Sequence, residues 1–269
     1  MNRNLFAREL RNNGLSLLLW SLAIMFLITL TMSVYQTVVV NQSKVLGMMN
    51  LIPKGALQFK GISDFNDLMS SLGFYAVNNI IYMMVLGSIF AIVLASNILL
   101  KEEYGKTAEY LLTRPVTRSE VFYTKLSIIL LYIFLLNLFT SLTGLACLEI
   151  FGTGSLDLLA FLTLSLYTFL LNLLFGSIGL FVSTLIKKPK PITTLCIGLV
   201  LVLYFIYTVS KLTQRYSWIG YISPFKYVRL EVTQTHYTLD GWRLAYFLGI
   251  AAVMTVGSFF LYGKKDIYT

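Results

Sequence analysis

The residues able to carry out chemistry are gathered in one polar segment near the middle of an otherwise apolar chain, "KEEYGKTAEYLLTRPVTRSEVFYTK", from Lys101 to Lys125. It holds acidic and basic side chains but no Cys, and the chain's single histidine, His236, lies elsewhere. Gly105-Lys106 lacks the upstream glycine of a G-x-x-x-x-G-K-[ST] loop, so the segment does not cradle phosphates. These residue types favour contact with another molecule over catalysis.

The same segment predicts a short surface helix, a turn and a second helix. Ala108, Leu111 and Leu112 form an apolar stripe at helical spacing, and a proline follows at position 115. "TRSE" then offers a capping box for the next helix, with its Thr as N-cap and its Glu three residues later. Two interpretations stay open: a docking element for a soluble partner, or a solvated loop held at the lipid headgroups by its basic residues.

The rest of the chain has the composition of a membrane protein. Its 269 residues are 57% hydrophobic and only 12% charged, whereas soluble domains carry about 25% charged residues. The net charge of +9 is explained by Lys and Arg in membrane-flanking loops, so nucleic acid is not expected as a partner.

Six runs without a charged residue are each long enough to cross a bilayer, which takes about 20 apolar residues. They are 12–43, 68–100, 126–148, 158–186, 191–210 and 244–263. Backbone groups in lipid must be satisfied internally, so each run predicts a helix. We expect an all-α membrane protein with one transmembrane domain, residues 1–269. Its spans are predicted at about 15–40, 70–100, 119–149, 157–186, 191–211 and 242–263.

The basic residues predict the orientation. The side that holds the N-terminus receives 13 Lys and Arg residues, and the other side receives 8. The positive-inside rule therefore places both termini and segment 101–125 in the cytoplasm. On the outer side, residues 41–67 and 211–243 mix apolar and polar residues, which predicts short interfacial helices. Five aromatic residues there fit an interfacial belt: Trp218, Tyr221, Phe225, Tyr227 and Trp242.

The uncharged runs offer neither an ion-coupling relay nor a catalytic centre. Cys147 and Cys196 lie in runs that place them in opposite leaflets, so neither a disulfide nor a metal site is expected. Four amides are candidates for helix packing or for contact with a transported molecule: Asn78, Asn79, Asn137 and Asn172. Two small-residue ridges predict close helix packing: Gly87, Ala91 and Ala95, and Ala245 with Gly249.

The polar segment resembles that of the permease subunits of ABC transporters of the second export class. The matching residues are Glu103, Gly105, Thr107, Glu109, Leu111, Leu112, Pro115, Val116, Arg118 and Lys125. The N-terminal "NLFARELRNNGLSLLLWSL", the outer "YISPFKY" and the closing "FLYGKKDI" are similar to further parts of the same family, so the resemblance covers the whole chain.

The resemblance implies a half-transporter that pairs with a second permease chain, identical or related, and with two separate ATP-binding subunits. Residues 2–14 would form an elbow helix along the inner leaflet, and residues 102–113 a coupling helix that docks on the ATPase. Docking would involve Glu102, Glu103, Tyr104, Gly105, Thr107, Glu109, Leu111, Leu112, Arg114, Pro115 and Arg118. This chain would bind no cofactor and would not be an enzyme, because ATP and Mg would be held by the partner.

We therefore expect an ATP-driven exporter subunit of the plasma membrane, of bacterial inner-membrane type. Its cargo would be an amphipathic peptide, a drug or a lipid-like molecule. Two alternatives remain from the residues alone. A secondary carrier would need inverted repeats or broken helices, and neither is evident in the sequence. A membrane anchor or sensor would recruit a cytoplasmic partner without moving cargo.

Overall fold

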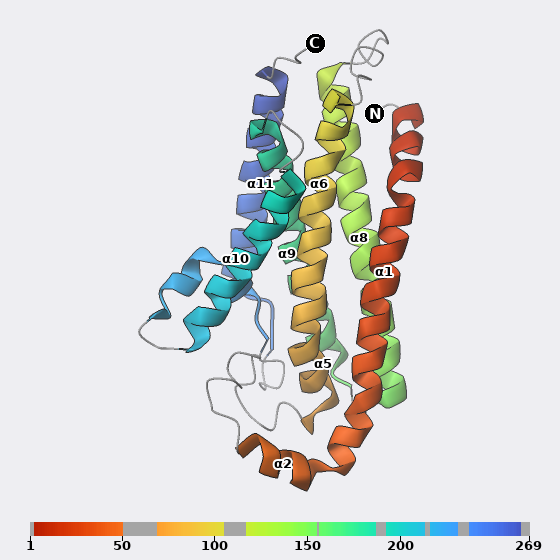
Figure 1. Ribbon diagram of the computed structural model, residues 1–269, viewed down its shortest axis with the longest axis vertical. Coiled ribbons are helices and arrows are strands. Elements are labelled where there is room, and N and C mark those ends of the chain that lie inside the picture. The colour runs from red at the N-terminus through yellow and green to blue at the C-terminus, as the bar shows by residue number, and fades with distance from the viewer. Residues whose placement is uncertain are drawn as a thin grey trace.

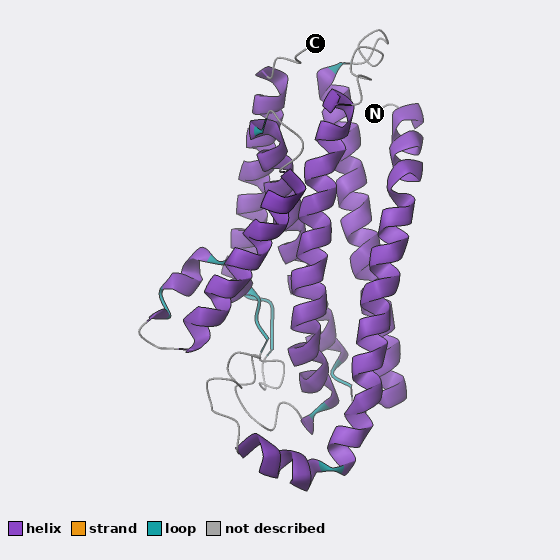
Figure 2. Cartoon of the chain, in the orientation of Figure 1, coloured by secondary structure: helices purple, strands orange, loops and turns teal. Residues whose placement is uncertain are grey.

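The structure is a computed structural model that describes residues 3–50, 69–104, 117–154, 156–186, 192–212, 216–230 and 237–264. These residues form helices and short connections and contain no strand (Figure 2). The long helices run side by side in a bundle, with the described ends of the chain, residues 3 and 264, at one end of it (Figure 1). We call this the terminal end, and the end that carries α2 (Gln42–Asn50) the opposite end.

Six spans of membrane length make up the bundle, which confirms the predicted all-helical fold and the number of spans. Each is apolar enough and long enough for the hydrocarbon core. The spans are α1 (Arg3–Val40), the continuous α5–η1–α6 (Ser71–Asn79, Ile80–Leu86 and Gly87–Tyr104), α8 (Arg118–Phe151), α9 (Leu158–Leu185), α10 (Ile192–Leu212) and α11 (Gly241–Lys264).

The first span differs from the prediction because it has no division near residue 14. Residues 3–40 form one uninterrupted helix of 38 residues, about 57 Å long at 1.5 Å per residue. No proline interrupts this stretch, so its backbone hydrogen bonds continue through Gly14. Residues 3–14 therefore continue into the helix of the span, and the elbow role of residues 2–14 along the inner leaflet stays a prediction.

The predicted capping box at the start of α8 is confirmed. The backbone N–H of Glu120 donates to Thr117 Oγ1 at 3.3 Å, and the N–H of Thr117 donates to Glu120 Oε2 at 3.1 Å. Two of the otherwise unpaired N–H groups at this helix end are therefore satisfied. Asp157 caps α9 in a similar way, by accepting from the N–H of Ala160 at 3.1 Å.

The centre of the bundle is the contact between α6 and α9. A Cβ added to Gly179 of α9 would lie 2.4 Å from the carbonyl oxygen of Ile92, and one added to Gly87 of α6 would lie 2.7 Å from Asn172 Nδ2. Ala91 and Ala95 on the same ridge of α6 are fully buried. The predicted close packing along this ridge is therefore confirmed, because only small residues let two helix backbones approach so closely.

Burial decreases outward from this pair. The most apolar window of α5–α6 is 80% buried within the chain, whereas that of α11 is only 17% buried. The second predicted ridge faces outward, since Ala245 is exposed and the space beside Gly249 is open. Its predicted close packing is therefore not formed with the described residues of the chain itself.

A π-helical segment, Ile80–Leu86, interrupts the second span. Such wide turns are rare and occur mostly as single turns inside α-helices. At this level the hydroxyl of Thr31 on α1 donates to the hydroxyl of Tyr82 at 3.0 Å. The wider winding shortens this long span for its number of residues and turns the side chains of α5 relative to those of α6.

The opposite end carries short helices in the described parts of the two predicted segments, whereas residues 51–67, 213–215 and 231–236 of those segments lie outside the described residues. α2 (Gln42–Asn50) crosses below the bundle (Figure 1), and two 3₁₀ turns follow α10: η3 (Ile219–Ile222) and η4 (Pro224–Tyr227). Trp218 is 63% exposed, as expected of an interfacial residue. The expectation for Phe225 was wrong, because it is fully buried against Phe175 and two tyrosines of α10.

The α6–α9 contact yields a stability prediction. Gly179→Ala should destabilise the protein by about 1–3 kcal/mol, the usual cost of overpacking, because the new Cβ meets backbone. The matched control is Gly198→Ala on α10, where a Cβ has open space and Ala is the better helix former. Thermal unfolding in detergent should show a lower midpoint for the first variant and an equal or higher midpoint for the second. Equal midpoints in both variants would contradict the close contact.

Candidate functional site

Of the predicted docking residues, the structure describes only those at the two ends of the segment. Glu102, Glu103 and Tyr104 lie in the last turn of α6, and Arg118 is the first residue of α8. Seven of them lie outside the described residues: Gly105, Thr107, Glu109, Leu111, Leu112, Arg114 and Pro115. Both helices that carry the segment end at the terminal end of the bundle (Figure 1), and its docking role stays a prediction.

The first turns of α8 are joined to α11. Arg118 Nη1 donates to the carbonyl oxygen of Gly263 at 3.2 Å. One turn further, the ring of Phe122 packs against Phe259 and Tyr262, with centroid distances of 5.4 and 5.9 Å. The start of α8 is therefore held by the last turns of the final span.

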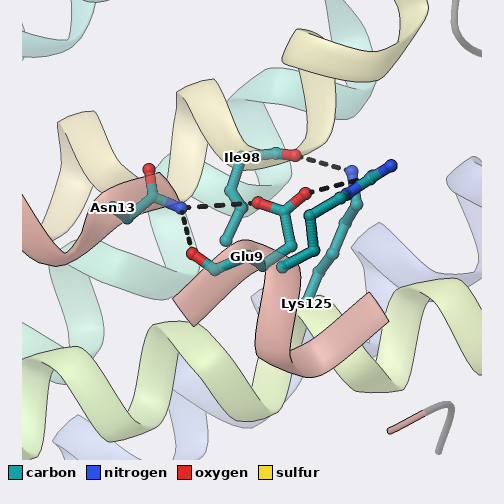
Figure 3. A network of polar contacts seen from close by, with 5 residues as sticks. Glu9, Asn13, Ile98 and Lys125 are labelled. Atoms are coloured by element: carbon teal, nitrogen blue, oxygen red, sulfur yellow. Dashed lines mark hydrogen bonds and ion pairs between the residues drawn. The ribbon is translucent and has the colours of Figure 1, made fainter. Parts of the chain in front are cut away.

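α8 is also joined to α6 through a buried charge. The side chain of Lys125 is fully buried, and its Nζ donates to the carbonyl oxygen of Ile98 at 2.6 Å (Figure 3). The sequence places Lys125 among the basic residues of the cytoplasmic side and also within the predicted span 119–149. In the structure it lies about two turns inside α8, which begins at Arg118, and its burial is what the sequence did not predict.

A second buried charge, Glu9, lies on α1. It is 3% exposed, and its carboxylate lies 3.5 Å from Arg8 Nη2 and accepts from Asn13 Nδ2 at 3.4 Å (Figure 3). The hydroxyl of Tyr132 on α8 donates to the carbonyl oxygen of Leu10, next to it. α1 is therefore bonded to α8 next to Glu9, whose described polar partners, Arg8 and Asn13, lie on α1 itself.

Sequence reasoning missed the burial of both charges, although each left a signal. Lys125 stands directly before the uncharged run 126–148, on the same side of a helix as Arg118 and Phe122. Glu9 stands among Leu5 and Phe6, and Leu5 is buried on the same face. Burying charged groups costs several kcal/mol unless they are paired, so such positions are candidates for function.

Deeper in the bundle, the structure brings Asn137 and Asn172 together. Asn172 Nδ2 donates to Asn137 Oδ1 at 3.2 Å, Ser88 Oγ donates to Asn172 Oδ1 at 3.2 Å, and Asn137 Nδ2 donates to the carbonyl oxygen of Ile133 at 2.8 Å. All three side chains are buried. The network connects α6, α9 and α8, and hydrogen bonds of this kind hold membrane helices together.

The other two candidate amides are not part of this network. Asn78 Nδ2 donates to the carbonyl oxygen of Phe74 at 2.9 Å, within its own helix, and the side chain of Asn79 lies outside the described residues. Contact of any of the four amides with a transported molecule stays a prediction.

A small pocket lies toward the opposite end of the bundle, between the π-helical segment, α8 and α9. It is lined by Tyr75, Ala76, Met83, Met84, Ser141, Leu164, Ser165, Thr168 and Leu230. The lining combines apolar groups with hydroxyls and has no charged side chain. Its volume of about 10 Å³ holds about one water molecule, so a larger molecule could enter only if the surrounding helices moved apart.

A cluster of charged side chains lies next to α9, on the side of the opposite end. Asp240 Oδ2 lies 3.0 Å from Arg243 Nε, and Asp240 Oδ1 lies 3.9 Å from Arg229 Nη1. The N–H of Asp240 donates to the hydroxyl of Tyr167 at 3.0 Å. Burial raises the pKa of the neighbouring Tyr237 phenol well above its usual range, so Tyr237 stays neutral and donates to the carbonyl oxygen of Arg229.

No group of three His, Cys, Asp or Glu side chains in the described part of the chain could hold a metal ion. Cys147 and Cys196 are buried free thiols. The main feature of this region is that α8, which follows the polar segment, is hydrogen-bonded to α11, α6 and α1.

Comparison with known proteins decides the family. Residues 3–267 match the family described as ABC-2 family transporter protein. The chain belongs to the ABC-2 transporter family. No curated protein matches the chain. As a member of the ABC-2 family with six apolar spans, it is a multi-pass membrane protein and the permease subunit of a transporter. Permeases of this family normally work with ATP-binding subunits.

The amide network of this ABC-2 permease yields a second stability prediction. Asn172→Ala should cost about 1–2 kcal/mol, the range for hydrogen bonds between membrane helices, because it leaves Asn137 Oδ1 and Ser88 Oγ without their partner. Asn78→Ala is the control, since its amide bonds within its own helix. Thermal unfolding in detergent should show the larger loss for Asn172→Ala. A smaller loss than in the control would contradict a packing role for the network.

Proposed function

We propose that this ABC-2 permease is the transmembrane subunit of an ATP-driven exporter and that residues 101–118 of its polar segment dock on a separate ATP-binding subunit. The observation that supports this most directly is the position of the segment. It joins α6 to α8 at the terminal end, where α8 is bonded to three other spans. A force applied to the segment would therefore act on four spans together.

The terminal end faces the cytoplasm in this proposal. The support is the distribution of basic residues, 13 on the side of the termini and 8 on the other, together with the positive-inside rule. Residues 102–113 would then form the coupling helix on the cytoplasmic side. The membrane would be the plasma membrane, where cytoplasmic ATP is available to the partner.

The energy for transport would come from the partner. The sequence has no G-x-x-x-x-G-K-[ST] loop, so ATP and Mg would bind to the separate subunit. The two buried charges, Glu9 and Lys125, lie in the terminal-end turns of α1 and α8. An ion-driven carrier instead needs titratable groups along its pathway through the membrane.

A second permease chain would complete the pathway. The apolar windows of α1 and α10 are each only 28% buried within the chain, and that of α11 only 17%. These faces must meet lipid or another chain. An amphipathic peptide, a drug or a lipid-like molecule stays the proposed cargo, as expected from the sequence. ATP binding would shift the pair of permeases between two packings, one open to each side.

Leu111→Asp tests the docking role. Leu111 belongs to the predicted apolar stripe, and a carboxylate in an apolar contact with the ATPase should weaken docking about tenfold or more. The permease would be purified from native membranes with its ATPase, and ATP turnover would be measured in vesicles. We expect partner-stimulated turnover to disappear while membrane insertion remains.

The matched control is Ser43→Asp, which adds the same charge at an exposed position of α2, at the opposite end. This variant should keep the stimulated turnover. Unchanged stimulation in Leu111→Asp, or an equal loss in both variants, would contradict docking through segment 101–118.

A further inference from the structure

The burial of Lys125 needs a physical reason. Its side chain is 0% exposed inside a membrane-length helix, and removing an ammonium group from water costs several kcal/mol. A lysine near the end of a span can extend its long stem toward the interface and keep its charge hydrated. Lys125 instead points into the bundle and donates to the carbonyl oxygen of Ile98 at 2.6 Å. An apolar side chain would fill the same space without the cost, so the hydrogen bond itself is the feature to explain.

The position of this bond is distinctive. Ile98 lies in the last turns of α6, which ends at Tyr104, and Lys125 lies in the first turns of α8, which begins at Arg118. The bond therefore joins the two helices that carry the polar segment, directly at its base. If the segment moves, α6 and α8 must move with it as one body, or this bond must break.

Other contacts of α8 and α6 show which further helices would move if these two helices moved together. The first turn of α8 is bonded to α11 through Arg118, and a turn about two turns beyond Lys125 is bonded to α1 through Tyr132. α6 in turn packs closely against α9, where a Cβ added to Gly179 would meet the carbonyl oxygen of Ile92. Among these described connections, the Lys125–Ile98 bond is the polar link between the start of α8 and the end of α6.

We infer that Lys125 is a positioning residue for energy coupling: its hydrogen bond to Ile98 holds the ends of α6 and α8 together, so that a displacement of the polar segment moves both helices. This inference rests on the proposed function, because it assumes that a partner moves the segment. Lys125 would touch neither ATP nor cargo.

The test replaces Lys125 by methionine, which has a similar length and no charge or donor. Hydrogen exchange of the backbone amides of residues 99–104 is measured first, on the permease alone in lipid nanodiscs. We expect faster exchange there in Lys125→Met than in the wild type, with unchanged exchange in the middle of α9. This readout does not depend on the ATPase.

The second measurement uses the permease reconstituted with its ATPase. Lys125→Met should still co-purify with the ATPase and still allow ATP hydrolysis. The factor by which the permease stimulates ATP turnover should fall about tenfold, which is a typical size for the coupling between two sites. Lys125→Arg, which keeps the charge and the donor, should retain most of the stimulation. Ser127→Ala is the control on the same helix, since its hydroxyl donates to the carbonyl oxygen of Tyr123, and it should behave as the wild type.

Each outcome decides the inference. Wild-type exchange at residues 99–104 in Lys125→Met would overturn it, and so would full stimulation of ATP turnover in that variant. A lower melting temperature with wild-type stimulation per folded molecule would reduce Lys125 to a stabilising residue and also overturn it. If Lys125→Met does not insert, Lys125→Gln, which is shorter and uncharged, takes its place under the same criteria. A wild-type permease that binds no ATPase would instead refute the proposed function, and the exchange measurement would still decide whether Lys125 holds the two helices together.

Discussion

The structure depends on how closely α6 can approach α9. At Gly179 the backbone of one helix lies so near the other that a single methyl group would meet the carbonyl oxygen of Ile92. Lipid supplies no hydrophobic force that drives membrane helices together, so close van der Waals contact and interhelical hydrogen bonds must do so. Both occur here. The amide of Asn172 on α9 lies against Gly87 of α6, and its Nδ2 donates a hydrogen bond to Asn137 Oδ1 on α8. The remaining spans surround this pair with progressively less buried surface.

This central pair is continuous with the proposed docking site. α6 packs on α9 in the middle of the bundle and meets α8 at the terminal end, where Lys125 reaches Ile98. α8 is bonded to the last span at this end through Arg118, and to the first span about two turns beyond Lys125 through Tyr132. A displacement that enters at the polar segment would thus reach the closely packed centre along one rigid helix. Packed interfaces of this kind switch between discrete arrangements and do not deform continuously, which is the behaviour that alternating access requires.

The parts of the fold that the sequence could predict depend on neighbours close along the chain. Six spans follow from run length and the absence of charge, and the capping box of α8 follows from Thr117 and Glu120 three residues apart. The ridge through Gly87 was predicted from local spacing, but the spacing does not say what will cover it, because Ala245 and Gly249 have the same spacing and face outward. The family resemblance rests on the same kind of local pattern, and the match over residues 3–267 confirms it.

What the sequence could not predict depends on contacts between distant residues. Lys125 was counted among the basic residues of the cytoplasmic side because charge normally marks the end of a span, and its burial depends on a carbonyl oxygen 27 residues away. Phe225 was placed at the interface because aromatic residues gather there, yet Phe175 and two tyrosines of α10 enclose it. The uninterrupted α1 and the π-helical turn have no local breaker or signature that would mark them. Residues 105–116 of the candidate docking site lie outside the described residues, so their role rests on sequence and family alone.

The central claim is that this permease moves cargo only when a separate ATPase drives it. The most direct test reconstitutes the permease in sealed vesicles, with and without the ATPase that co-purifies with it, and measures uptake of a neutral fluorescent amphiphile into inside-out vesicles. The account predicts uptake against a gradient only when the ATPase and Mg-ATP are both present. Accumulation by the permease alone, driven by a proton or sodium gradient, would contradict it.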